Sequence, residues 1–240
     1  MLKFFRSIRK KLIEEDNVRK YILYAIGEIL LVVIGILIAL QVNNWNEQRK
    51  LNTEIETFQK ALLSELQNDL LSIDQKLEII RMNMKRDSAL YNRVTGPDAT
   101  LDTLVQIGRY EYDIWINPMV NFNDNTLNSL ESSGLLPLLD GQIRTGILDL
   151  TNQKELYKKQ LETNIEYFLD ALNNYRSKYR LDSNEGGSPI SDQLWEQASP
   201  DLYALMTSVM TAQNVTNGNS LGFLRSIRKK INRLNQELEK

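Results

Sequence analysis

The feature that most constrains this 240-residue chain is an apolar run near its N-terminus. Residues 21–42 read YILYAIGEILLVVIGILIALQV and include one ionisable side chain, that of Glu28. A helix of this length, rising about 1.5 Å per residue, crosses a hydrocarbon layer of about 30 Å. The run ends in QVNNW, which lacks the small-residue cleavage pattern of a secretory signal peptide. We therefore expect an uncleaved transmembrane helix over residues 21–43.

The charges on either side of this run predict its orientation. Residues 1–20 carry seven basic and three acidic side chains, whereas only Arg49 and Lys50 follow the run closely. Basic residues are enriched on the cytoplasmic side of a membrane. We expect residues 1–20 to form a cytoplasmic, basic, amphipathic segment on the lipid membrane, and residues 44–240 to form an extracytoplasmic helical domain. The aromatic side chains expected at the two membrane interfaces are Tyr21, Tyr24 and Trp45.

One face of the predicted span is small and polar. Its residues recur every three or four positions, and they are Glu28, Val32, Gly35, Ala39 and Asn43. Two small residues four apart allow helices to approach closely. We interpret this face as a packing surface in a homo-oligomer, with Glu28 hydrogen-bonding across it. Two alternatives stay open: a ring of Glu28 side chains lining a cation or proton path, or a Glu28 near the interface without a special role.

The rest of the chain has the pattern of helices. Residues 45–92 contain no Pro or Gly and have an apolar residue every three or four positions, which predicts a long helix continuing from the span. A second long helix is predicted over 138–180 as its antiparallel partner, with an apolar seam interrupted once by Lys154. We expect an all-α fold, in which a single transmembrane helix continues into an elongated helical bundle or hairpin.

Shorter elements complete this expectation. Gly96-Pro97 ends the first long helix, a short helix covers 100–110, and Asn123 or Asp124 caps a helix that ends at Gly134. A polar loop over 182–189 precedes a helix over 191–211. We expect residues 214–220 to break that helix before a last one over 221–240.

A nine-residue sequence occurs twice in slightly different form. Residues 4–12 read FFRSIRKKL, and residues 223–231 read FLRSIRKKI. Both have the pattern of a basic amphipathic helix. We expect the second copy to pack in the bundle, the alternatives being contact with the outer leaflet or with another subunit.

The chain contains no histidine and no cysteine, which excludes most catalytic chemistry. Thiol nucleophiles, disulfides, histidine bases and thiolate or imidazole metal sites are all impossible. No nucleotide-binding or hydrolase motif occurs, and carboxylate pairs such as Glu111 with Asp113, or Asp124 with Glu131, are more simply solvated or capping groups. We expect no enzyme activity, catalytic residue, metal or cofactor. Nucleic acid is also disfavoured as a partner, since residues 47–240 carry 22 basic and 27 acidic side chains.

The least helical stretch, residues 111–125, is the best candidate for recognition. It is rich in aromatic, Asn and Asp residues, and exposed loops on a rigid scaffold often bind partners. The candidate residues are Glu111, Tyr112, Asp113, Trp115, Asn121 and Asp124. Ordinary connecting structure is the competing interpretation.

Two segments resemble a known family. The sequence FFRSIRKKL followed by KYILYAIGEILLVVIGILIALQVNNWNE resembles the N-terminal signature of an uncharacterised bacterial family, whose members are single-span inner-membrane proteins of Gram-negative bacteria. Residues 125–139, NTLNSLESSGLLPLL, are similar to that family's middle region. The resemblance implies an inner-membrane location, a cytoplasmic N-terminus and a periplasmic domain, and implies no activity or cofactor.

These observations favour an oligomeric structural or interaction component of a membrane. Its expected partners are lipid, further copies of itself, and other membrane or periplasmic proteins. The alternatives are a subunit of an ion-conducting oligomer that uses Glu28, and a membrane sensor. The sensor is weakened by a predicted cytoplasmic segment of only about 20 residues.

Overall fold

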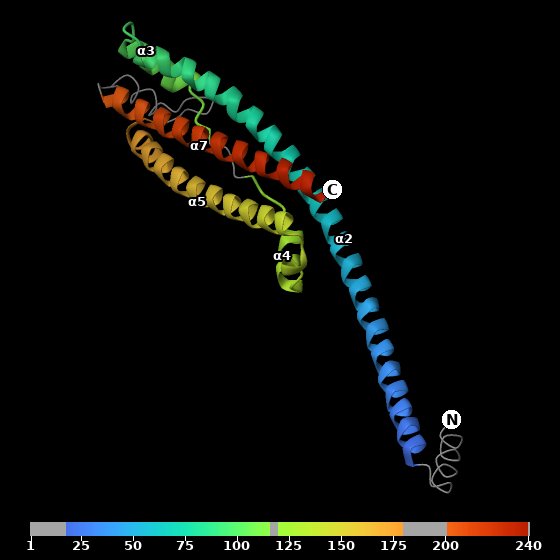
Figure 1. Ribbon diagram of the computed structural model, residues 1–240. Helices are drawn as coiled ribbons and strands as arrows, with labels where there is room; N and C mark the ends of the chain where they lie inside the picture. Colours follow the sequence, from blue (N-terminus) through green and yellow to red (C-terminus); the bar gives the residue numbers. More distant parts are fainter. Residues whose placement is uncertain (1–17, 116–119, 180–200, 240) are drawn as a thin grey trace. The chain divides into compact units, whose positions relative to one another are not determined.

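The computed structural model describes residues 18–115, 120–179 and 201–239 (Figure 1), and these residues include no strand. The prediction of an all-α fold is confirmed. The elements are α2 (Val18–Thr95), α3 (Leu101–Gln106), the π-helix η1 (Ile107–Glu111), α4 (Asn125–Ser133), the 3₁₀-helix η2 (Leu136–Leu138), α5 (Gly141–Lys178) and α7 (Asp201–Leu238). Residues 1–17 of the basic segment expected over 1–20, and the loop expected at 182–189, lie outside the described residues.

Helix α2 is continuous from the apolar run into the first long seam, as predicted. No Pro or Gly interrupts residues 45–92, so nothing local breaks the hydrogen-bond ladder. The helix ends at Thr95, before the Gly96-Pro97 pair. A Cβ atom at Gly96 would lie 2.9 Å from the Asn92 carbonyl oxygen, so only glycine fits this close turn.

The chain divides into two compact units, Met1–Thr57 and Phe58–Lys240. The described part of the first unit is the N-terminal part of α2. Large apolar side chains along its run are open to the surroundings, with Leu31 68% exposed. Within the described residues, α2 is the one helix long and apolar enough to cross a membrane, and none of its most apolar window is buried inside the chain.

The second unit is built on three long helices: α2 from Phe58 onward, α5 and α7. Side-chain hydrogen bonds and ion pairs between the helices show their relative directions. Between α7 and α2 they join Arg228 to Asp74 and Gln213 to Asp87. Between α7 and α5 they join Lys230 to Asp149 and Thr216 to Asn164. Helix α7 is therefore antiparallel to both other helices (Figure 1). Consequently α2 and α5 are parallel, and the predicted antiparallel hairpin of these two helices is wrong.

The connection between α2 and α5 explains this parallel arrangement. Residues 112–124, here called the return segment, are described over 112–115 and 120–124. The segment pairs with successively earlier residues of α2, since Asp113 lies 3.4 Å from Arg86 and the Asn123 amide lies 3.2 Å from Asp69. The chain thus travels back along α2 before α5 begins, so α5 starts beside the earlier part of the second unit.

Helix α7 also differs from the prediction, because it passes through residues 214–220 without a break. Three polar residues of this stretch, Thr216, Asn217 and Ser220, are buried. Thr216 Oγ1 donates to the carbonyl oxygens of Ala212, at 2.9 Å, and Asn164, at 3.3 Å. Packing of the helix face therefore outweighs the low helix propensity of the stretch.

The second copy of the repeated sequence packs in the bundle, as predicted. Leu224, Ile227 and Ile231 on α7 are fully buried. Their three- and four-residue spacing places the basic residues of the copy on the outer side of the helix. The first copy lies outside the described residues.

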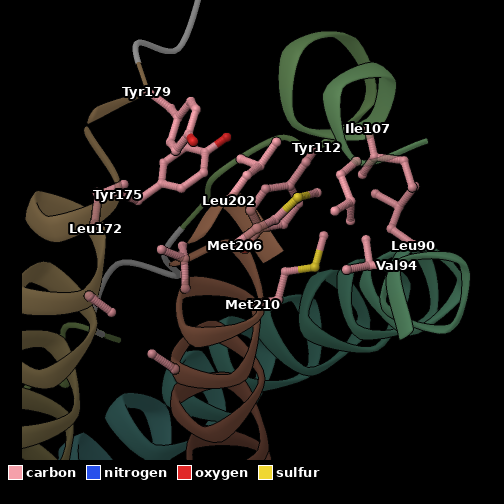
Figure 2. Close-up of a cluster of buried hydrophobic side chains, with 14 of the residues drawn as sticks. Leu90, Val94, Ile107, Tyr112, Leu172, Tyr175, Tyr179, Leu202, Met206 and Met210 are labelled. Atoms are coloured by element: carbon pink, nitrogen blue, oxygen red, sulfur yellow. The ribbon is translucent and has the colours of Figure 1, made fainter. Parts of the chain in front are cut away.

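One apolar cluster joins every element at the end of the second unit where α2 stops. Figure 2 shows side chains from α2, η1, α5 and α7 in contact around Met206 and Met210. Val94, Ile107 and Leu202 are fully buried there. This cluster fixes α3 and η1 on the bundle and so sets where the return segment begins.

Candidate functional site

The interruption of the α5 seam at Lys154 is a buried ionic cluster. The Lys154 side chain is 2% exposed, and its Nζ lies 2.8 Å from Asp69 Oδ2 and 2.9 Å from Asp124 Oδ1. The same Nζ lies 4.8 Å from the ring centroid of Phe122, a distance at which cation and ring attract. We call Glu65, Asp69, Phe122, Asp124 and Lys154 the Lys154 cluster. It joins α2, the return segment and α5.

The carboxylates of this cluster also hold the start of α4. Glu65 Oε2 accepts a hydrogen bond from the Thr126 amide at 3.0 Å, and Asp69 Oδ1 accepts one from the Asn123 amide at 3.2 Å. Amides at the beginning of a helix lack partners within it and favour nearby negative charge. Asp124 is the N-cap residue, as predicted, but it makes no side-chain cap bond. Its carboxylate is turned toward Lys154 instead.

Burial determines what the Lys154 cluster can do. Asp69 and Lys154 are both 2% exposed as residues, so no ligand in solution reaches them. Removing charges from water is costly, and the cost is offset here by short, mutual hydrogen bonds. The cluster is therefore an internal clamp that fixes which residues of α2, α4 and α5 face one another.

A second buried polar network lies farther along α2. Gln213 on α7 donates to Asp87 Oδ2 at 2.7 Å and accepts from the Tyr112 hydroxyl at 3.0 Å. The Trp115 amide donates to the same Gln213 oxygen at 3.4 Å. Arg86 lies 3.3 Å from Asp87 and supplies the opposite charge. We call these residues the Gln213 network; it holds the start of the return segment against α2 and α7.

The expectation of an exposed recognition loop is wrong for Tyr112, which is buried because its ring enters the apolar cluster and its hydroxyl bonds Gln213. Asp113 and Asn121 are exposed, and Trp115 is half-buried. Asp113 pairs with Arg86, and Glu111 pairs with Arg93, whose hydrogen bond lowers the pKa of the Glu111 carboxyl. Glu111 and Asp113, weighed as a catalytic pair, are thus engaged by separate cations. The recognition role of the segment stays a prediction.

Burial shapes the pKa of Tyr112. Desolvation raises the pKa of its hydroxyl well above the ordinary value of 10.0, and the negative charge of Asp87 raises it further. The folded state therefore favours the neutral hydroxyl. The resulting stability is fully present below pH 10 and is lost as pH rises, because the hydroxyl of the unfolded chain then ionises first.

This gives a testable pH dependence. We expect Tyr112→Phe to cost about 1 kcal/mol near pH 7, where one hydrogen bond is lost. Above pH 10 the free energy of unfolding should fall less steeply with pH in the variant than in the native chain. The two slopes should differ by up to about 1.4 kcal/mol per pH unit. Urea unfolding of the full chain in detergent at pH 8, 10 and 11 measures both effects. The exposed Tyr110, replaced by Phe, is the control, and parallel pH profiles for Tyr112→Phe and the native chain would contradict the assignment.

The small polar face lies on the first unit. A Cβ atom at Gly35 would meet nothing within 4 Å, and Asn43 donates to Glu47 Oε1 at 2.9 Å within the same helix. A shallow groove beside Glu28 is bordered by Ala25, Ile29, Val32 and Val33. Trp45 is 65% exposed, with the Arg49 guanidinium 5.8 Å from its ring centroid. Tyr24 is half-buried, and the side chain of Tyr21 lies outside the described part.

Comparison with known families gives one match. A family of unknown function, DUF6090, matches residues 28–178. The chain belongs to this family. The matched range includes the small polar face, the Lys154 cluster and the return segment, and it ends with α5; α7 lies beyond it. No curated protein and no solved structure matches the chain. The resemblance to an uncharacterised family is confirmed at this level.

The sequence did not indicate the Gln213 network, because Gln213 lies between the predicted helix over 191–211 and the predicted break over 214–220. It did mark Lys154, as the single charged residue inside an apolar seam. A lysine that is almost fully buried requires a partner of opposite charge, and this rule could have prompted a search for an acidic partner of Lys154. The described residues contain no group of three acidic side chains that could hold a metal ion.

Proposed function

We propose that this member of DUF6090 is an oligomeric single-pass membrane protein whose helical domain is a structural or interaction component. The observation that carries the proposal is the uncovered surface of the first unit. Among the described residues nothing covers its apolar side chains, with Leu23 and Ile29 each 64% exposed. A membrane is the surrounding in which such a helix is stable.

Within a membrane, lipid covers the broad apolar surface, and a second helix suits the small polar face. The run of Gly35, Ala39 and Asn43 offers lipid little contact but lets another helix approach closely. Glu28 on the same face is a polar group that can hydrogen-bond across a contact between helices. The excess of basic residues before the span supports a cytoplasmic N-terminus, and a bacterial inner membrane with a periplasmic domain is the setting proposed.

The helical domain suits a structural role more than a chemical one. The Lys154 cluster and the Gln213 network are buried polar groups that bond to the protein itself. Both connect α2 to the return segment, the first also to α5 and the second also to α7. Such bonds fix the position of the return segment. The exposed residues of that segment, Asp113 and Asn121, are then held on a rigid scaffold, as a surface for a partner requires.

Gly35→Leu tests the packing face. In the isolated chain the new side chain meets open space, so the monomer should fold normally. Between helices it prevents close approach, and we expect the oligomer in detergent to weaken by about 5- to 30-fold, equivalent to about 1–2 kcal/mol of helix contact. Light scattering coupled to size exclusion, over a dilution series, measures this change.

Leu37→Phe is the matched control, because it adds bulk to an exposed position on the opposite side of the same helix. If both variants leave the oligomer unchanged, the proposed packing face is contradicted. If the native chain is monomeric at all concentrations, the proposed oligomerisation is contradicted. If the native chain conducts cations across reconstituted vesicles and Glu28→Gln abolishes this flux, the ion-path alternative is favoured.

A further inference from the structure

The second unit carries a basic groove of about 610 Å³ between α2 and α7. Five cationic side chains and one carboxylate line it: Arg81 and Asp74 on α2, and Arg225, Arg228, Lys229 and Arg233 on α7. Residues 47–240 carry more acidic than basic side chains. A concentration of five cations in one groove is therefore a local feature against an acidic background.

The fold forces these cations to the groove. Leu224, Ile227 and Ile231 are fully buried, so the rotation of α7 about its axis is fixed. Arg225, Lys229 and Arg233 are then placed one helical turn apart in a row, with neighbouring positions about 5–6 Å from one another. An amphipathic helix with this buried seam needs only polar residues on its outer side, and uncharged ones would serve as well. The choice of three cations in a row requires another reason.

Most of this positive charge is not neutralised by the protein. Arg228 lies 2.7 Å from Asp74, and Arg81 lies 3.5 Å from Glu78. Across the described part of the chain, Arg225, Lys229 and Arg233 form no ion pair. Like charges one turn apart on a helix repel one another, and the repulsion disappears when an anion lies between them.

We propose that this groove binds a ligand carrying two or more phosphate groups. Guanidinium groups donate paired hydrogen bonds to phosphate oxygens, and four of the five cations are arginines. The cations come from two helices that form opposite walls. A tetrahedral phosphate accepts hydrogen bonds from several directions at once, whereas a planar carboxylate accepts mainly in its own plane. The length of the row, two helical turns, suits more than one phosphate.

The ligand chemistry is available from a soluble polyphosphate compound or from a phospholipid headgroup. Both present phosphate oxygens to the arginines. This site is independent of the packing face in the first unit, so binding is expected whether or not the span forms oligomers. Binding should weaken steeply with salt, because each phosphate contact is ionic and largely exposed.

The test uses the full chain in a non-ionic detergent at about 100 mM salt, an ionic strength that leaves a Debye length of about 10 Å. Titration calorimetry measures binding of two probes: sodium tripolyphosphate, and a short-chain, water-soluble phosphatidylinositol bisphosphate. The variant Arg225→Gln/Lys229→Gln/Arg233→Gln removes the row. Exposed ion pairs contribute up to about 1 kcal/mol each, so we expect the triple variant to bind roughly 30- to 100-fold more weakly.

The matched control is Lys60→Gln/Lys85→Gln/Lys159→Gln, which removes the same charge at exposed positions outside the groove. We expect it to bind within about 3-fold of the native chain, since distant exposed charges are screened. If the groove variant loses binding of tripolyphosphate but the control variant does not, a soluble ligand is supported. If the groove variant loses binding of the phosphatidylinositol bisphosphate but the control variant does not, a lipid headgroup is supported. Equal losses in both triple variants, or no binding of either probe by the native chain, would overturn the proposal.

Discussion

Lys154→Met is expected to lower the free energy of unfolding of the helical domain by about 3–5 kcal/mol. The substitution keeps the length and apolar stem of the side chain but removes the charge. Asp69, which is 2% exposed, then loses its countercharge, and Asp124 keeps only the more distant Lys158, at 3.6 Å. Urea unfolding of the full chain in detergent, followed by circular dichroism, measures the change.

Two further variants make the result specific. Lys159→Met removes an exposed lysine from the same helix and should change stability by less than about 0.5 kcal/mol. Lys154→Met/Asp69→Leu should recover part of the loss, because removing both partners leaves no unpaired charge between them. Hydrogen exchange at the Asn123 amide should accelerate in Lys154→Met, since the Asp69 carboxylate that binds this amide is no longer held by Lys154. A Lys154→Met chain as stable as the Lys159 control would refute the clamp.

Gln213→Leu is expected to cost about 2–5 kcal/mol. Leucine fills the space but removes the hydrogen-bond partner of the Asp87 Oδ2 atom and of the Tyr112 hydroxyl, and each buried polar group left unsatisfied costs about 1–3 kcal/mol. The Asp87 Oδ1 atom keeps Arg86, at 3.3 Å. The same unfolding measurement applies. Quenching of tyrosine fluorescence by a soluble quencher should also increase, because the Tyr112 ring becomes accessible to it.

Gln75→Leu, at an exposed position of α2, is the control for a Gln-to-Leu change and should be close to neutral. Comparing Gln213→Leu with Gln213→Leu/Tyr112→Phe isolates the hydroxyl. The double variant should be more stable than the sum of the two single losses indicates, because residues that share one hydrogen bond are not additive. Additive losses would show that Gln213 and Tyr112 stabilise the domain separately.

The two networks suggest why the domain keeps charged and polar groups in its interior. An apolar seam alone allows long helices to slide by one turn, and it does not specify whether α5 lies parallel or antiparallel to α2. The Lys154 cluster and the Gln213 network each bond one position of α2 to one position of α5 or α7. They thereby fix both register and direction, at a cost in desolvation.

Several elements could be predicted because their causes are local. The continuity of α2 follows from the absence of Pro and Gly, and its end from Gly96-Pro97. The helix from Asn125 to Ser133 ends at Gly134, whose φ of 71° is the left-handed conformation that glycine adopts at a helix end. The helix predicted over 138–180 begins at Gly141, where Asp140 accepts a hydrogen bond from the Gln142 amide at 2.7 Å. In each case the cause lies within a few residues.

Periodicity also identified most of the core, and it failed where a polar residue had a distant partner. Thr216 and Ser220 were assigned to a break, yet both are buried inside a continuous α7. Tyr112 was assigned to an exposed loop, and its partner Gln213 is 101 positions away. A pattern of apolar residues cannot distinguish a solvated polar side chain from one that is paired across the bundle.

The sequence by itself thus determined the membrane-length apolar helix, the all-α class and the positions at which most helices begin and end, since these depend on neighbouring residues. Only the tertiary structure decided that α2 and α5 are parallel, that Lys154 is a clamp and that the second basic copy lines a groove. Asp69 and Lys154 are 85 positions apart, and Asp74 and Arg228 are 154 apart. Contacts over such separations depend on the path of the return segment, which no local pattern specifies.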